Sequence, residues 1–137
     1  MAKRLTIEEL NNVRLHIEPE VARLAAKNIS SDHALRLQNA IAGEHMAEAI
    51  DERTTSLTKV HLVLAKMWGN FFHEFFVNAL LSITREIIIT GYREGDMVVH
   101  GTNQHDDIVK AILESNPDEA ARAMRVHLKK YSENDSA

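Results

Sequence analysis

The chain has 137 residues, of which 45% are hydrophobic and 26% charged, a size and composition typical of one globular domain. It contains no cysteine, so disulfides and thiolate metal sites are excluded, and any metal ion must be held by nitrogen and oxygen ligands. The formal net charge of −4 argues against nucleic-acid binding by this chain alone, because phosphate contacts need a face rich in lysine and arginine.

Two helices are predicted in the first third of the chain. Thr6 and Glu9 form the capping-box pattern of a helix start, and apolar residues then recur at helical spacing. Pro19 should kink this helix or restart it, because proline lacks the backbone donor. After a break in the pattern, Ser31 is expected to cap the second helix.

Two longer helices are predicted in the middle. One starts between residues 51 and 54 and ends at Trp68, where Gly69 offers a C-terminal stop. The next runs from Phe71 to about Thr90, and although its isoleucine-rich end makes a strand conceivable, its length favours a helix. Four phenylalanines gather in residues 71–76, for which core packing is the preferred interpretation, followed by a dimer interface and then a wider apolar cavity.

A helical hairpin follows a long connection. Its arms span about residues 102–114 and 117–131, with Asn116 as the N-cap of the second arm. No repeat or low-complexity linker divides the chain. We therefore predict an all-α fold, a single antiparallel bundle of about six helices over residues 6–131, with tails at 1–5 and 132–137.

Three of the eight histidines lie where their helices should present core residues. His105 and His127 are each about ten residues, or about 15 Å of helix, from the hairpin turn, so they should face each other at one level. His61 lies on the inward stripe of a third helix, with Leu57 and Leu64. Taken singly, each would be interpreted as a core histidine bonded to a carbonyl. Together they predict a shared site, because one cation could satisfy three buried rings and leave a coordination position open.

Four segments, VRLHIEPEVARLAA, VHLVLAKMWGN, QHDDIVKAI and DEAARAMRVHL, follow one another in this order. Together they resemble the C-terminal, effector-sensing domain of the FadR subfamily of GntR bacterial transcription regulators, over about residues 7–131. The resemblance implies an antiparallel helical bundle in which one aspartate and three histidines hold a divalent metal ion at the floor of a cavity. Leu57 stands where the aspartate is expected, one turn before the first histidine.

The resemblance assigns the three metal-binding histidines to His61, His105 and His127. Two arrangements stay open: the rings hold an ion such as zinc or nickel, or they bond directly to an organic acid. Arg14 matches an arginine of the family and is expected to hold the acid's carboxylate by a two-pronged bond, the alternative being a surface arginine. Asn70 is included as a ligand-binding candidate, although a capping or packing role is the preferred interpretation.

The predicted function is effector sensing and dimerisation in a transcription regulator. The expected effector is a small carboxylate, with an apolar acyl or ring-bearing acid among the candidates, and the expected assembly is a homodimer. DNA contacts would belong to a winged-helix domain that precedes this one in the family and is not found in this chain. A small three-histidine, metal-dependent hydrolase is the alternative, disfavoured because no carboxylate shares the inward stripes of the three histidines to act as a general base. A helical scaffold with incidental histidines ranks third. No stretch of apolar residues is long enough to span a membrane, and the first residues lack the apolar stretch of a signal peptide. The cytoplasm is therefore the expected location.

Overall fold

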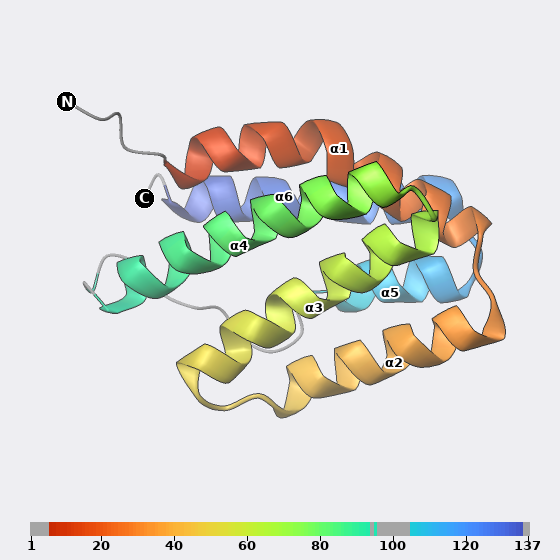
Figure 1. Cartoon of the computed structure of the whole chain (residues 1–137), viewed down its shortest axis with the longest axis horizontal. Coiled ribbons are helices and arrows are strands. Elements are labelled where there is room, and N and C mark those ends of the chain that lie inside the picture. Colours follow the sequence, from red (N-terminus) through yellow and green to blue (C-terminus); the bar gives the residue numbers. More distant parts are fainter. Residues whose placement is uncertain (1–5, 94, 96–104, 136–137) are drawn as a thin grey trace.

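The computed structural model describes residues 6–93, 95 and 105–135, which form six α-helices and no strand. The helices are α1 (Ile7–Lys27), α2 (Ser31–Met46), α3 (Ile50–Trp68), α4 (Phe71–Arg93), α5 (Asp106–Leu113) and α6 (Pro117–Asp135). In Figure 1, α1 and α6 lie side by side, α3 lies between α4 and α2, and α5 lies behind α3. The prediction of an all-α bundle of about six helices is confirmed.

The start of α1 follows the predicted capping box. The Thr6 hydroxyl accepts the Glu9 backbone N–H at 3.1 Å, and the Glu9 carboxylate accepts the Thr6 backbone N–H at 3.2 Å. Pro19 lies inside α1 without ending it, so the helix does not restart there. The cap of α2 is Ser30 rather than Ser31, because the backbone of Ser30 is extended and its hydroxyl accepts a backbone N–H three residues later.

The middle helices end as their residue types require. Gly69 ends α3 with φ of 77°, the left-handed conformation that favours glycine. The isoleucine-rich segment is helical, and α4 extends to Arg93, beyond the predicted end at about Thr90. None of the helices in the described residues is long and apolar enough to cross a membrane.

The hairpin forms as predicted, with shifted ends. Helix α5 begins at Asp106; the predicted start at about 102 lies outside the described residues. Helix α6 extends to Asp135, past the predicted end at 131. The Asn116 side chain caps α6 by accepting the Glu119 backbone N–H at 3.3 Å.

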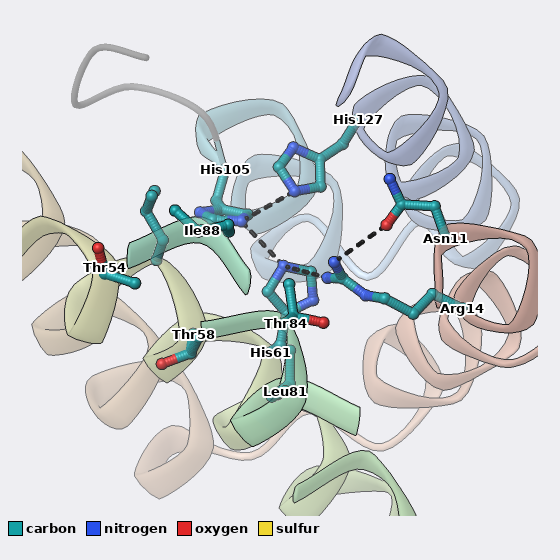
Figure 2. A pocket seen from close by; sticks show the side chains of 11 residues that line it. Asn11, Arg14, Thr54, Thr58, His61, Leu81, Thr84, Ile88, His105 and His127 are labelled. Carbon is teal, nitrogen blue, oxygen red and sulfur yellow. Dashed lines mark hydrogen bonds between the residues drawn. The ribbon is translucent and has the colours of Figure 1, made fainter. Parts of the chain in front are cut away.

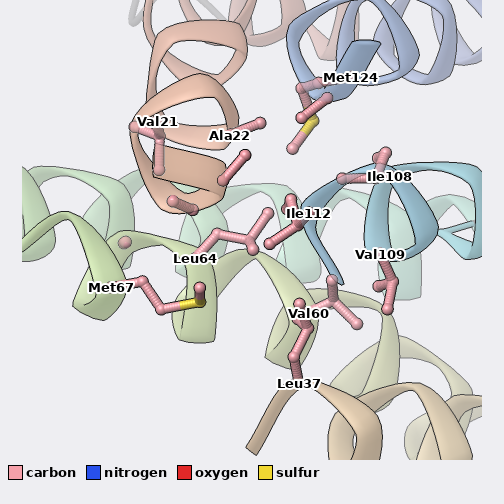
Figure 3. Close-up of a cluster of buried hydrophobic side chains, with 14 of the residues drawn as sticks. Val21, Ala22, Leu37, Val60, Leu64, Met67, Ile108, Val109, Ile112 and Met124 are labelled. Atoms are coloured by element: carbon pink, nitrogen blue, oxygen red, sulfur yellow. The ribbon is translucent and has the colours of Figure 1, made fainter. Parts of the chain in front are cut away.

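The apolar core is formed by α1, α2, α3, α5 and α6, with a contribution from α4 (Figure 3). Fully buried members from five of these helices are Val21, Leu37, Leu64, Ile112 and Met124. This core includes the C-terminal half of α1 and both arms of the hairpin. The histidine cluster described below borders the core, because His61 and His127 lie midway along α3 and α6, next in sequence to the core members Val60 and Leu128.

The phenylalanines of α4 do not join this core. Phe71, Phe72, Phe75 and Phe76 are 82%, 74%, 67% and 38% exposed. The inward face of α4 is formed by Val77, Leu81 and Thr84, which are buried. Helical periodicity therefore places the four phenylalanines on the other faces of this helix. Core packing, the preferred interpretation of this segment, was therefore wrong.

Candidate functional site

Three histidines, one on α3, one directly before α5 and one on α6, meet at one cavity (Figure 2). The Nε2 atom of His105 lies 3.0 Å from Nε2 of His61 and 3.1 Å from Nε2 of His127. All three side chains are buried, and one ligand atom from each lies within 4.8 Å of the others. Two nitrogens bonded at about 2.05 Å to a tetrahedral ion would be roughly 3.3 Å apart, so this cluster could hold a metal ion. The expectation that these rings share one location is confirmed.

The hairpin turn sets the level at which two of these rings meet. Ser115 adopts a positive φ of 54°, and its N–H donates to the Ile112 carbonyl at 2.9 Å, which reverses the chain directly after α5. Seen from the turn, His105 lies at the far end of α5, directly before its first residue. His127 lies a similar length of helix away from the turn along α6. Similar distances from one turn therefore bring the two rings to the same level, with their centroids 4.4 Å apart and their planes tilted by 54°.

Two buried glutamates, which the sequence did not predict, contact the histidine rings. The Nδ1–H of His61 donates to Glu18 on α1, and the Nδ1–H of His105 donates to Glu44 on α2 at 2.5 Å. Glu44 also accepts the backbone N–H of His105 at 3.3 Å. The expectation that no carboxylate shares the inward stripes of the three histidines concerned only the helices that carry them; α1 and α2 supply the two acids.

Arg14 is buried at the wall of the cavity, with 5% of its surface exposed, so the surface interpretation was wrong. Its Nε–H donates to Glu18, and its Nη1 donates to the side-chain oxygen of Asn11 at 3.4 Å. Its Nη2 lies 3.4 Å from Nε2 of His61 (Figure 2). The guanidinium is thus held between an acid, an amide and one of the three imidazoles.

Burial and neighbouring charges set the protonation of the cluster. Burial lowers the pKa of His61 to about 4, although the adjacent Glu18 carboxylate opposes that shift. Burial, together with His105 and other nearby groups, holds the pKa of His127 well below its usual range. Burial alone would raise the pKa of Glu18, but Arg14 and His61 hold it well below that of an ordinary glutamate. His61 and His127 are therefore neutral at pH 7, while Glu18 is ionised.

The rest of the cavity is lined by three threonines and three aliphatic residues: Thr54, Thr58, Thr84, Leu57, Leu81 and Ile88. Its free volume is about 30 Å³, which is room for about two water molecules. Asn70 lies elsewhere, exposed before the start of α4, where its side-chain oxygen accepts the His73 backbone N–H at 3.1 Å. Its capping role explains its position, and Asn70 is not among the described residues that line the cavity.

Comparison with known proteins identifies the family. Residues 9–130 match the FCD domain, the C-terminal domain of GntR-family regulators, and the chain belongs to this family. It is 27% identical over 134 residues to the HTH-type transcriptional repressor NanR of Klebsiella aerogenes, an alignment that covers 92% of this chain and 50% of that protein. The solved structure of Streptococcus agalactiae GntR has the same fold, with a TM-score of 0.76 at 24% identity over 93% of this chain and 58% of that one. The chain thus spans about half the length of the relative named a repressor.

Proposed function

We propose that this chain is the effector-sensing and dimerisation domain of a GntR-type transcription regulator, and that it binds a small organic acid at His61, His105 and His127. The observation that carries the proposal is the convergence of three buried imidazoles on one cavity. Buried ring nitrogens need a hydrogen-bond partner or an ion, and one bound ion could satisfy all three Nε2 atoms at once. Membership of the FCD family supports the sensing role, because GntR regulators bind small-molecule effectors.

A divalent ion such as zinc or nickel is proposed to mediate this binding. Three imidazole nitrogens suit such an ion and leave at least one coordination position open for the acid. Charge supports the same arrangement. Among the described residues, the buried ionisable side chains other than histidine are Arg14, Glu18 and Glu44, which carry one net negative charge when all three are ionised. A carboxylate would meet repulsion in that set without a cation, so metal-mediated binding is favoured over direct bonding to the rings.

Arg14 is proposed to steady the bound acid with its Nη2 group. The two-pronged bond expected from the sequence is not available on the Nε side, because Glu18 already accepts that N–H. Asn11 accepts from Nη1. The Nη2 group beside the Nε2 atom of His61 is the part of the guanidinium next to the proposed metal position. A carboxylate with one oxygen on the ion could therefore receive a charge-assisted bond from Arg14 on the other.

The size of the cavity restricts the effector. A free volume of about 30 Å³ accommodates an ion with its water, and displacement of that water makes room for a short acid. A longer acyl or ring-bearing acid would need the apolar wall formed by Leu81 and Ile88 of α4 to move. The proposal therefore names a short organic acid first, and the larger apolar acid only with an opened cavity.

Dimerisation is proposed to use the exposed phenylalanines of α4. Three rings that are each more than 60% exposed, Phe71, Phe72 and Phe75, form an apolar surface on one segment of one helix. Soluble proteins seldom leave such surfaces uncovered, and a second copy of the chain is the common partner in homo-oligomers. The usual dimeric state of GntR regulators supports this assignment.

The hydrolase alternative is less well supported. The described residues that line the cavity include no carboxylate, because Glu18 and Glu44 contact the far side of the rings. A metal-bound water would therefore have no adjacent general base. A relative of this chain is named a transcriptional repressor, which favours regulation over catalysis. DNA contacts of such a regulator would lie in a separate winged-helix domain of the whole protein.

Metal analysis combined with calorimetry tests the proposal. Protein purified without chelator should contain about one divalent ion per chain, and a series of short carboxylates should include one that binds this form and not the chelator-treated form. His127→Ala should lose both ion and acid. His33→Ala, which removes a histidine outside the cluster, should lose neither. Equal acid binding with and without metal would refute the metal-mediated form, and no binding by any short acid would count against the cavity as the effector site.

A further inference from the structure

Two buried carboxylates lie behind the histidine cluster and do not line the cavity. Glu18 is 3% exposed and Glu44 is 1% exposed. Each accepts a hydrogen bond from the Nδ1–H of a different ring, Glu18 from His61 and Glu44 from His105. Both carboxylates therefore contact the side of a histidine ring that faces away from the proposed ligand position.

The contacts of His61 admit one neutral tautomer. An ionised carboxylate only accepts hydrogen bonds, so the Nδ1 atom facing Glu18 must carry the proton. A guanidinium only donates, so the Nε2 atom 3.4 Å from Nη2 of Arg14 must present a lone pair. Both neighbours thus require the same state of the ring, protonated at Nδ1 and unprotonated at Nε2. That state is the one able to bind a metal ion from the cavity.

His105 is held from behind in the same way. One oxygen of Glu44 accepts the Nδ1–H at 2.5 Å, and the other accepts the backbone N–H of the same residue at 3.3 Å. His105 is the N-cap of α5 but forms no side-chain cap bond of its own, and Glu44 of α2 adds its negative charge at this helix start to those of Asp106 and Asp107 in the first turn. One carboxylate therefore fixes both the backbone and the ring, and the Nε2 atom is left facing His61 and His127.

We propose that Glu18 and Glu44 are positioning residues that hold His61 and His105 as Nδ1–H tautomers, so that both Nε2 lone pairs point to one ligand position. Two lone pairs 3.0 Å apart repel unless a positive species lies between them. The glutamates also supply negative charge behind the rings. On the cavity side, the position where the family resemblance implies an aspartate carries the apolar side chain of Leu57. This inference rests on the proposed function, because the ligand position is the proposed site of the ion.

Nitrogen-15 NMR of the histidine rings tests the tautomers directly. In the chelator-treated chain, His61 and His105 should show a protonated Nδ1 and an unprotonated Nε2. Glu18→Gln and Glu44→Gln keep the shape of each side chain, but the two donors that each carboxylate serves bond to different oxygens. The glutamine NH2 group that replaces one of those oxygens cannot accept a hydrogen bond. Each variant should therefore increase the Nε2–H form of its own histidine and leave the other ring unchanged.

Zinc affinity, measured by competition with a chromophoric chelator, provides the second readout. Each variant should bind Zn²⁺ about 10- to 100-fold more weakly, the range found when an outer hydrogen-bond partner of a metal-binding histidine is lost. Glu20→Gln and Glu48→Gln are matched controls, because these exposed glutamates lie on or near the same helices. Both controls should leave the tautomers and the affinity unchanged.

The two readouts separate failure of this inference from failure of the proposed function. A wild-type chain with Nε2–H on both rings, or glutamine variants with unchanged tautomers and zinc affinity, would overturn the positioning role. Wild-type protein with the expected tautomers but no zinc binding would support the positioning role and overturn the metal. Should a glutamine variant fail to fold, Glu18→Asp and Glu44→Asp retain the charge but move the carboxylate back from the ring, and a loss of zinc affinity is expected there too.

Discussion

Removal of the Arg14 side chain should destabilise this protein far more than removal of an exposed arginine. Arg14 and Glu18 are 5% and 3% exposed, and Arg14→Met leaves the Glu18 carboxylate buried without its cationic partner. Breaking a buried ion pair in this way costs about 3 to 5 kcal/mol. Since domains are stable by about 5 to 15 kcal/mol in total, the midpoint of urea unfolding should fall markedly.

The double variant Arg14→Met with Glu18→Gln should recover most of that loss. The glutamine oxygen can still accept the Nδ1–H of His61, and no unpaired charge stays buried. Urea unfolding at pH 7, followed by circular dichroism on chelator-treated protein, gives the free energy of each variant without a contribution from metal. Arg23→Met, which breaks an exposed pair with Glu20 on the same helix, should change stability little. A double variant no more stable than Arg14→Met would refute the reasoning, because the cost would then not come from the stranded carboxylate.

Three further outcomes are expected. The pKa of His61 is about 4 in the folded chain against 6.5 for the free side chain, so its contribution to stability is complete above pH 6.5 and is lost as the pH falls from 6.5 towards 4. The loss in chelator-treated protein should approach about 3 kcal/mol by pH 4, and a flat unfolding free energy across this range would contradict it. Light scattering at tens of micromolar, the usual scale for weak association, should show a homodimer that Phe72→Glu with Phe75→Glu converts to a folded monomer; a monomeric wild type would contradict the proposed dimer surface. The isolated chain, with a formal net charge of −4, should not bind operator-length duplex DNA, and salt-dependent micromolar binding would count against this expectation.

The helices were predictable because their ends carry local chemical signals. The Thr6 capping box, the stop at Gly69 and the Asn116 cap each involve residues that are close in sequence. Helix ends without such a signal were less predictable. Helix α6, for example, extends to Asp135, past the predicted end at 131. The level of His105 and His127 was also predictable, because a short turn and a fixed helical rise determine it without knowledge of the other helices.

The two glutamates were not predictable from the same patterns. Glu18 is 43 residues from its histidine in sequence and Glu44 is 61 residues from its own, so each contact depends on how separate helices pack. A charged residue in a helical pattern is by default assigned to the solvated face. The signal that could have found them is the need of a buried imidazole for a partner at its second nitrogen. The phenylalanines of α4 illustrate the converse, because large apolar side chains are assigned to a core by default and here they face outward.

The buried charges also determine the order in which the proposed site would fill. With His61 and His127 neutral, Arg14, Glu18 and Glu44 carry one net negative charge when ionised, and a dication converts this to one positive charge. A carboxylate then completes neutrality, whereas the same acid without the ion would add a second negative charge in a buried cavity. Metal should therefore bind before acid. Because coupling between two ligands is reciprocal, an acid that binds the metal-loaded chain more tightly must tighten metal binding by the same factor, so a sensor of this design would respond to both.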